Sequence, residues 1–196
     1  MENVREQLAY IGRMLFERRL MDTAGGNISA RQGNRIFISP KYSGSKRHWQ
    51  LDPEEFIEGE IGSNEVLNHP MFSREGKAHV AIYLNFPDVQ GVIHAHPFHI
   101  LPFCAAGKTI EPMLEQTQKF GVIQLVKAAP AHSAELAENI VAGLRGQEKA
   151  IQTQAAAVLV PQHGIIVAGR DILAAVDALE RIDWNAWCIL AQRLLE

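Results

Sequence analysis

Apolar residues recur at every third or fourth position near the N-terminus, and this spacing predicts an amphipathic helix over residues 2–20. Charged residues fill the intervening positions, and the apolar face holds Val4, Leu8, Ile11 and Leu15. The same period returns over residues 171–195, where the shared face holds Ile172, Val176, Leu179, Ile182 and Ile189. We therefore expect a second, long helix at the C-terminal end.

Shorter helices are predicted between these two. Residues 75–85 have helical spacing, and Ser133 is expected to cap a helix that runs to about residue 146. In the stretch 51–57, Asp52 is the expected cap of a short helical turn with Pro53 at its first position.

Strands are predicted where apolar residues alternate with polar ones or run together. These stretches are residues 35–40, 89–96, 121–128, 155–161 and 164–169. Residues 23–29 are rich in glycine and small polar side chains, and residues 41–50 are expected to form a loop.

The order of these elements is not a regular alternation of strand and helix. Gly25 and Gly26 do not make a dinucleotide-binding fingerprint, because the third glycine and a preceding strand are missing. A mixed or antiparallel sheet covered by helices fits the pattern best. The length of 196 residues suits one compact domain over residues 1–196.

Composition and charge exclude several classes of protein. The formal net charge is −3 with no long run of one sign, so we expect neither nucleic acid nor a membrane surface as a partner. No apolar run approaches the roughly 20 residues of a membrane span, and the N-terminal stretch lacks the features of a secretory signal. We expect a cytoplasmic protein in which Cys104 and Cys188 are buried packing residues.

Three histidines form the strongest candidate for chemistry. His94 and His96 lie two positions apart in a predicted strand, so their side chains share a face. His163 follows a strongly apolar strand and precedes a glycine, and a buried imidazole at such a turn needs a partner. Three histidines with one open position are typical of a catalytic zinc site, with manganese or cobalt as alternatives. We expect His99 to be a supporting or surface residue.

A carboxylate and several small polar residues extend this candidate site. Glu75 and His79 lie four positions apart on a predicted helix, and Glu75 can act as a general acid and base beside a metal. The alternative for Glu75 is an interaction with the helix dipole, and His79 is expected to be a packing residue. Backbone and side-chain donors suited to a phosphate occur at Gly26, Asn27, Ser43, Gly44 and Ser73.

Five segments carry these residues, and they span most of the chain: TAGGNIS (23–29), ISPKYSG (38–44), SREGKAH (73–79), GVIHAHP (91–97) and QHGIIVAG (162–169). In this order and spacing they resemble the class II aldolase/adducin family, in its metal-dependent sugar-phosphate branch with L-fuculose-phosphate-aldolase-like members. The resemblance implies a three-layer α/β/α fold around a predominantly antiparallel sheet. It also implies a homotetramer with active sites at the subunit interfaces.

The resemblance further implies roles for individual residues. His94, His96 and His163 would bind one Zn²⁺ per subunit, and Glu75 would be the acid/base residue, which can itself touch the metal when substrate is absent. The phosphate of a small phosphorylated sugar would lie against the five small polar residues. The implied reaction is zinc-dependent cleavage of a ketose 1-phosphate, such as L-fuculose 1-phosphate, through a metal-stabilised enediolate to dihydroxyacetone phosphate and an aldehyde.

Three features depart from the pattern of the fuculose-phosphate members. Arg74 stands where those members usually have a second serine, and its guanidinium can hold a phosphate or select a carboxylate. The loop over residues 41–50 is longer and basic, so Lys46 and Arg47 either contact an anionic substrate or face solvent. No tyrosine lies after residue 105, where the aldolases have a proton donor from a neighbouring subunit.

Glu115 lies near the position of a catalytic glutamate in the methylthioribulose-1-phosphate dehydratase branch, although that branch generally lacks a counterpart of Glu75. The resemblance therefore favours an aldolase first and such a dehydratase second. A pentulose-5-phosphate 4-epimerase and a sugar-acid-phosphate decarboxylase are further alternatives on the same site. Two non-catalytic hypotheses also stay open, namely an adducin-like assembly module and a metal-binding protein without turnover.

Overall fold

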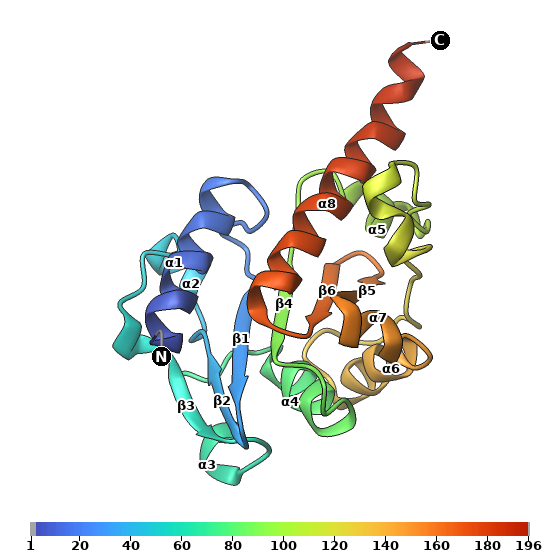
Figure 1. Ribbon diagram of the computed structural model, residues 1–196. Coiled ribbons are helices and arrows are strands. Elements are labelled where there is room, and N and C mark those ends of the chain that lie inside the picture. The colour runs from blue at the N-terminus through green and yellow to red at the C-terminus, as the bar shows by residue number, and fades with distance from the viewer. Residues whose placement is uncertain (1–2, 196) are drawn as a thin grey trace.

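Six strands form one sheet in the computed structural model, which describes residues 3–195 (Figure 1). The strands are β1 (Asn27–Gln32), β2 (Arg35–Ile38), β3 (Ile57–Glu60), β4 (Gly91–Ala95), β5 (Ala155–Val160) and β6 (Gly164–Gly169). Their order across the sheet is β3-β2-β1-β4-β6-β5, and every neighbouring pair is antiparallel. The predicted antiparallel arrangement is confirmed.

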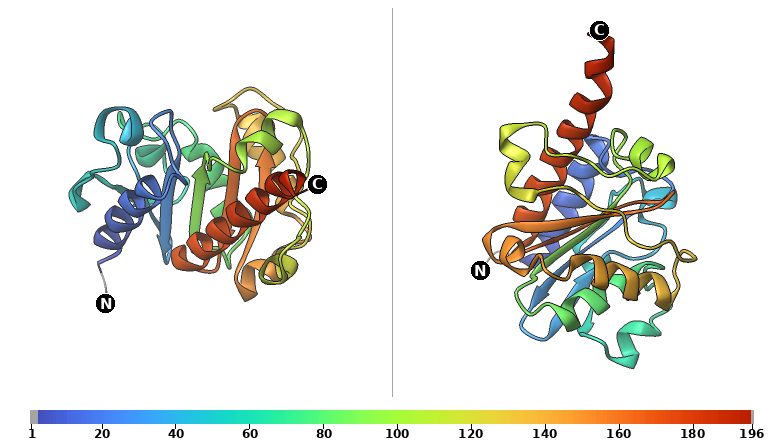
Figure 2. Two further views of the ribbon diagram at one scale, coloured as in Figure 1. Left: turned by 90° about the horizontal axis from the view of Figure 1, so that it is seen from above. Right: turned by 90° about the vertical axis from the view of Figure 1, so that its right-hand side faces the viewer.

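Helices cover both faces of this sheet (Figures 1 and 2). α1 (Val4–Glu17) and α8 (Ile172–Ala191) bury their apolar faces in one hydrophobic core. α4 (Gly76–Asn85), α6 (Ala134–Leu144) and α7 (Glu148–Thr153) pack in a second core on the opposite face. The expected three-layer α/β/α fold is confirmed.

The central strand β4 shows why the sheet needs two covering layers. All five of its residues are buried. Ile93 and Ala95 belong to the core under α1 and α8, while Val92 belongs to the core under α4 and α6. Alternate side chains of a strand point to opposite faces, so an apolar strand of this kind requires cover on both sides.

Short helices complete the connections. They are α2 (Ser43–Arg47), α3 (Asn64–Leu67) and α5 (Leu101–Ala106), with 3₁₀ turns at Pro53–Glu55, Glu115–Phe120 and Gln192–Leu194. The predicted cap Ser133 is present, and Asp171 caps a second helix without having been predicted to do so. The Ser133 side chain accepts a hydrogen bond from the backbone of Leu136 at the start of α6, and Asp171 does the same from Ala174 in α8.

Two local predictions were wrong. Residues 121–128 do not form a strand, because their backbone makes only isolated bridges, at Ile123 and at Leu125. Their apolar alternation reflects burial in two different cores, since Ile123 packs in one and Val126 in the other. The loop expected at residues 41–50 contains helix α2, which begins after Tyr42 in a left-handed backbone conformation.

Two strands, β1 and β3, were not predicted. β1 is the third strand across the sheet, but four of its six side chains are polar. Asn27 and Ser29 are nonetheless buried, because they hydrogen-bond to Ser73 and to His79 on the covering layer. Only Ile28 and Ala30 are apolar in this strand, and the burial of Asn27 and Ser29 depends on partners that lie far along the chain, so the sequence gives only a weak strand signal here.

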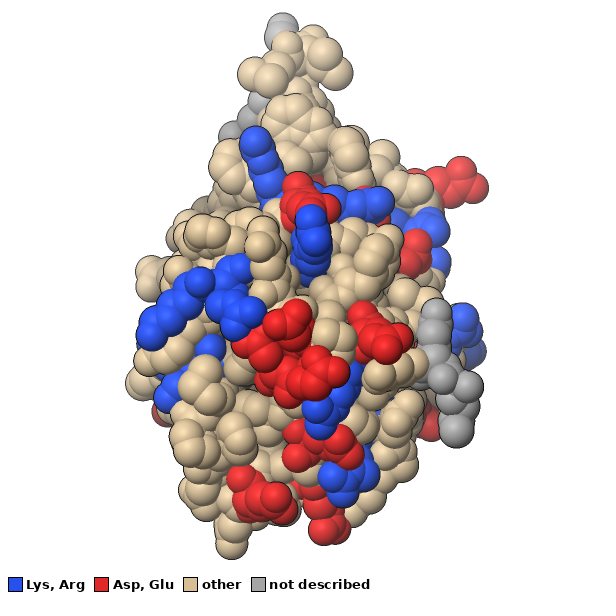
Figure 3. Space-filling model, turned by 90° about the vertical axis from the view of Figure 1, so that its left-hand side faces the viewer, with Lys and Arg blue, Asp and Glu red and all other residues tan. Residues whose placement is uncertain are grey.

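The charged residues of the surface are interspersed. On the side that carries α1, α2 and β3, basic and acidic side chains lie next to one another (Figure 3). Glu58 accepts from both Arg5 and Arg35 at 2.7 Å, and Arg47 pairs with Glu55. Over residues 3–195, none of the helices is both long enough and apolar enough to cross a bilayer. Cys104 is buried and Cys188 is partly buried, and both are free thiols.

Candidate metal centre and substrate pocket

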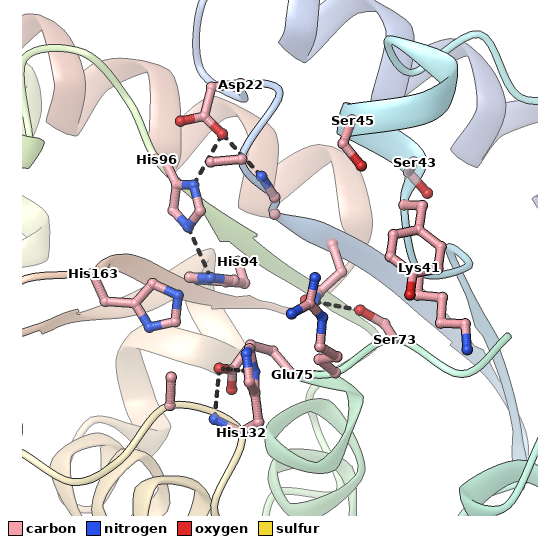
Figure 4. Close-up of a pocket in the computed structure, with 18 of the residues that line it drawn as sticks. Asp22, Lys41, Ser43, Ser45, Ser73, Glu75, His94, His96, His132 and His163 are labelled. Atoms are coloured by element: carbon pink, nitrogen blue, oxygen red, sulfur yellow. Dashed lines mark hydrogen bonds and ion pairs between the residues drawn. The ribbon is translucent and has the colours of Figure 1, made fainter. Parts of the chain in front are cut away.

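The candidate site lies at one end of the central strands, where four elements begin or end. β4 ends beside the start of β1, so that His94 is paired with Asn27 across the two strands. The turn between β5 and β6 places His163 at the same end of the strands, and Glu75 lies at the N-terminus of α4. The fold brings these ends of strands and of a helix together, although they are far apart in the sequence (Figure 4).

A cavity of about 400 Å³ opens between these elements. Among its lining residues are all the predicted metal and phosphate residues, namely Gly26, Asn27, Ser43, Gly44, Ser73, Arg74, Glu75, His94, His96 and His163. It is also lined by residues that the sequence did not single out, including Asp22, Lys41, Ser45 and His132. The structure therefore brings the five sequence segments to one place.

The three histidines offer their ring nitrogens to a common point. One nitrogen from each of His94, His96 and His163 lies within 4.8 Å of the others. The Nε2 atoms of His94 and His96 are 3.2 Å apart. Two ligands of a tetrahedral ion with bonds of about 2.0–2.1 Å lie about 3.3 Å apart, so the spacing of these two atoms fits such an ion.

Hydrogen bonds orient two of the rings. His94 Nδ1 lies 3.2 Å from the backbone oxygen of Ile165, to which it can donate, and His96 Nδ1 lies 3.1 Å from the Asp22 carboxylate. With the proton on Nδ1 in each ring, both Nε2 atoms carry lone pairs that face each other. Two lone pairs at 3.2 Å repel each other unless a cation lies near both, which fits the donor set to a divalent metal.

Burial prepares the histidines for such a role. Desolvation lowers the pKa of His94 well below its usual value, and the neighbouring His96 and His163 lower it further. Desolvation also lowers the pKa of His163, against an opposing effect of Glu75. Because a metal binds the neutral imidazole, these two side chains need lose no proton near pH 7 when the ion enters.

Asp22 is a residue that the sequence analysis missed. Its Oδ1 accepts hydrogen bonds from the ring of His96 and, at 3.0 Å, from the backbone of Gly25. Burial alone would raise the pKa of Asp22, but the hydrogen bonds from His96 and from the backbone of Gly25 and Ala24 bring it below its usual value. One carboxylate thus joins the glycine-rich segment to the candidate metal site.

Gly164 permits the close approach of β6 to the site. A Cβ atom at this position would lie 2.3 Å from the backbone oxygen of Ala95 and 2.8 Å from the ring of His96. Any other residue would therefore push the two strands apart or move a candidate ligand. This explains why glycine follows His163 in the sequence.

Glu75 lies buried at the edge of the pocket. Its Oε1 accepts a hydrogen bond from the backbone of His132 at 3.0 Å, and the ring Nδ1 of His132 lies 2.7 Å from the same oxygen. His79, one turn along the helix from Glu75, is fully buried with its Nδ1 2.7 Å from the hydroxyl of Ser29. Glu75 therefore lies at the pocket, and His79 is a packing residue, as expected.

The phosphate candidates form the other side of the pocket. The side chain of Asn27 donates to the hydroxyl of Ser73 at 2.7 Å, while its own Oδ1 is buried without a partner in the described structure. The hydroxyl of Ser43 donates to the backbone oxygen of Pro40 at 2.6 Å, which fixes the start of α2. Gly26 and Gly44 line the same wall.

Basic side chains gather around Tyr42 at this wall. Lys46 Nζ lies 4.4 Å from the centre of the Tyr42 ring, Lys41 Nζ lies 5.5 Å from it, and the Arg74 guanidinium carbon lies 5.9 Å from it. Within residues 3–195, none of these three cations makes an ion pair with a carboxylate. Lys41 and Arg74 line the pocket, whereas Lys46 and Arg47 do not, and Arg47 pairs with Glu55.

Other candidates lie outside this pocket. Glu115 is exposed at the start of a 3₁₀ turn and does not line the cavity of its own subunit, so its proposed catalytic role stays a prediction. His99 donates from its backbone to Asp183 and places its ring 2.7 Å from the same carboxylate, which makes it a supporting residue of the loop after β4. Burial raises the pKa of the Cys104 thiol to about 12, as expected for a packing residue.

Comparison with known proteins places this site in context. The family model of the Class II Aldolase and Adducin N-terminal domain matches residues 6–190. The chain is 30% identical over 175 residues to an L-fuculose phosphate aldolase from Methanococcus maripaludis, covering 86% of this chain and 88% of that protein. It is 25% identical to a 3-oxo-tetronate 4-phosphate decarboxylase from Haemophilus influenzae, covering 93% of this chain and 84% of that protein.

The fold is also similar to that of solved structures. An L-fuculose 1-phosphate aldolase superposes with a TM-score of 0.85 at 21% identity, covering all of this chain and 89% of the other. At this identity the likeness concerns the fold. It shows the same arrangement of sheet and helices as described above.

Proposed function

Because the chain belongs to the class II aldolase and adducin family, we propose that it is a metal-dependent lyase that cleaves a ketose 1-phosphate of the L-fuculose 1-phosphate type. The family membership confirms the prediction of an enzyme of the lyase class. The observation that carries the finer proposal is the pair of Nε2 atoms of His94 and His96, 3.2 Å apart on a cavity walled by phosphate-type donors.

We propose Zn²⁺ as the metal, with Mn²⁺ or Co²⁺ as alternatives, held by His94, His96 and His163 with one ion per subunit. All three ligands are nitrogen atoms, and three histidines with an open position are typical of catalytic zinc. When bound, the ion supplies Lewis acidity to oxygen atoms of the substrate next to the breaking carbon–carbon bond.

The other residues of the pocket bind the substrate and move a proton. Backbone and side-chain donors at Gly26, Asn27, Ser43, Gly44 and Ser73 hold the phosphate, and this remote anchor positions the reacting carbons. Glu75 has an oxygen, Oε2, without a hydrogen bond to any described residue, and it transfers the proton at the carbon from which the aldehyde departs. The products are dihydroxyacetone phosphate and an aldehyde.

A decarboxylase acting on a phosphorylated sugar acid is the second candidate. Arg74 and Lys41 line the pocket without carboxylate partners in the described structure, and a guanidinium binds a carboxylate through two parallel hydrogen bonds. The decarboxylase relative from H. influenzae supports the same candidate. For the dehydratase and the epimerase, no residue of the pocket favours either one over the aldolase.

We also propose a homotetramer with active sites at subunit interfaces, as the family resemblance implies. Exposed apolar side chains on α8, including Trp184 and Trp187, support contacts between copies of the chain. The cytoplasmic location stays a prediction from the sequence.

Product analysis tests the proposed reaction. Zinc-loaded protein is incubated with L-fuculose 1-phosphate, with methylthioribulose 1-phosphate and with a 3-oxo-tetronate 4-phosphate, beside a chelator-treated control. We expect metal-dependent release of dihydroxyacetone phosphate from the first substrate. Release of carbon dioxide from the third would establish the second candidate, and loss of water without carbon–carbon cleavage would establish the dehydratase.

Two variants separate binding from catalysis. Glu75→Gln is expected to lose turnover while its zinc content stays close to that of the wild type, measured by elemental analysis. His94→Ala is expected to lose zinc and turnover together. A fully active Glu75→Gln protein would contradict the role of Glu75, and stoichiometric zinc in His94→Ala would contradict the ligand assignment.

A further inference from the structure

Tyr42 lies at the centre of a cluster of basic side chains on the wall of the cavity. Lys46 Nζ, Lys41 Nζ and the guanidinium carbon of Arg74 lie 4.4, 5.5 and 5.9 Å from the centre of its ring. All three cations are within the roughly 6 Å over which the face of an aromatic ring attracts a positive charge. Tyr42, Lys41 and Arg74 line the cavity, so one ring holds both of the lysine and arginine side chains that face it.

The backbone of Tyr42 is in a conformation that few side chains of this size adopt. Its φ is +69°, in the left-handed region. Hydrogen bonds on both sides hold it there. The backbone N–H of Lys41 donates to the oxygen of Met71 at 2.8 Å, and the hydroxyl of Ser43 donates to the oxygen of Pro40 at 2.6 Å. A strained residue on the wall of a pocket indicates that the direction of its side chain is used.

The three cations have no negative partner in the described part of the chain. None of them lies within ion-pair distance of a carboxylate there. The acidic residues that line the cavity are Asp22 and Glu75, and each of them lies against a histidine. Positive charges that gather around one ring repel each other, and an anion in the cavity removes this repulsion.

We propose that Tyr42 is a positioning residue, whose ring holds Lys41 and Arg74 at the cavity as a subsite for an oxyanion of the substrate. The oxyanion is the phosphate or a carboxylate of the sugar chain. Lys41 lies on the same side of the pocket as Ser43, across from the three candidate metal ligands (Figure 4). The proposal rests on the proposed function only in that this cavity holds the substrate, and it does not depend on the metal.

Binding of free anions to the metal-free protein tests the proposal. Inorganic phosphate and a phosphate-free four-carbon sugar acid are titrated by calorimetry at neutral pH and constant ionic strength, after metal and chelator have been removed. Tyr42→Asn removes the ring, and asparagine tolerates the left-handed region. Tyr42→Phe keeps the face of the ring and loses only the hydroxyl. We expect Tyr42→Asn to weaken binding of one of these anions about fivefold, and Tyr42→Phe to stay within about twofold of the wild type.

Two arginines of this wall provide a matched comparison. Arg74→Gln is expected to weaken binding of the same anion about tenfold. Arg47→Gln should leave the affinity unchanged, because Arg47 pairs with Glu55 and does not line the cavity. Because the ring acts through the cations, Tyr42→Asn should also cost less affinity in the Arg74→Gln background than in the wild type. A purely structural role of Tyr42 would give equal losses in both backgrounds.

Several results would overturn the proposal. They are unchanged affinity for both anions in Tyr42→Asn, equal losses in the two backgrounds, and a wild type that binds neither anion. Wild-type affinity in Arg74→Gln would also overturn it, and that measurement does not depend on any Tyr42 variant folding. The anion whose binding responds to Tyr42 identifies the group that the subsite takes. Failure of the wild type to bind zinc would contradict the proposed metal centre and leave these binding results unaffected.

Discussion

At the scale of single residues, three of the catalytic and metal-binding candidates are oriented by a neighbour that is remote in the sequence. His94 is fixed by the backbone of Ile165, His96 by Asp22, and Glu75 by His132. Such partners select the ring tautomer and hold the side chain in one rotamer, so the ligand atoms need little reorganisation when a metal binds.

Asp22→Ala is expected to weaken zinc binding by about 10–100-fold, because His96 loses the acceptor that keeps its proton on Nδ1. Asp22→Asn should lie between the alanine variant and the wild type, since an amide oxygen still accepts from His96 and from Gly25. Chelator competition measures the affinities. If Asp22→Ala bound zinc as tightly as the wild type, the orienting role would be wrong.

At the scale of elements, the site depends on short segments that pack against backbone. Helix α2 carries Ser43 and Gly44 and lies directly on the turn at residues 22–23. A Cβ atom added at Gly44 would be 2.4 Å from the backbone oxygen of Asp22 and 3.2 Å from that of Thr23. The same contact places α2 next to the segment that orients His96.

Gly44→Ala should therefore disturb both the candidate phosphate residues of α2 and the turn at residues 22–23. We expect the free energy of unfolding to fall by about 1–3 kcal/mol, as for other overpacked positions, with a raised KM for the phosphorylated substrate. Urea unfolding and steady-state kinetics measure the two effects. Lys46→Ala on the exposed side of α2 is the stability control and should stay within about 0.5 kcal/mol of the wild type.

At the scale of the whole molecule, one sheet supports two hydrophobic cores, and polar side chains are buried in the second. His79 is fully buried there against Ser29, with Nε2 lacking a partner in the described structure. Desolvation lowers the pKa of His79 from 6.5 to about 3. The unfolded chain thus binds a proton on His79 between pH 6.5 and 3 that the folded protein does not bind.

The free energy of unfolding should accordingly fall as the pH drops below 6.5, with a slope of up to about 1.4 kcal/mol per pH unit from His79. Chelated wild type and His79→Gln are compared by urea unfolding at pH 7 and pH 5.5. We expect the wild type to lose about 1 kcal/mol more than the variant over this interval. Equal losses would mean that His79 is not the neutral buried group described above.

The C-terminal part of α8 projects beyond the rest of the molecule (Figure 1). Trp184 is 55% exposed on it, and Leu194, in the 3₁₀ turn that follows, is 79% exposed. If these side chains form contacts between copies, Trp184→Glu combined with Leu194→Glu should reduce the sedimenting mass to that of the 21.8 kDa chain. Leu84→Glu, on an equally exposed position of α4, should leave the mass of the wild-type assembly unchanged.

The elements with strong hydrophobic periodicity were predictable from the sequence. They include α1, α6 and α8, because burial of one face imposes a repeat that the sequence displays locally. The hairpin of β5 and β6 was predictable as two continuous apolar runs, because both strands are buried on both faces. The histidine triad was predictable for a similar reason, since its residues lie in or directly after apolar strands. The five sequence segments, in their order along the chain, predicted the family and its antiparallel sheet, and both predictions are confirmed.

The tertiary structure decided what depends on partners far apart in the chain. β1 was missed because Asn27 and Ser29 are polar and are buried only by the layer that carries Ser73 and His79. Asp22 and His132 gave no signal, since their partners lie 74 and 57 positions away. Local patterns in a sequence record which side chains are buried, whereas the pairing of hydrogen-bond partners is decided only when the strands and helices meet.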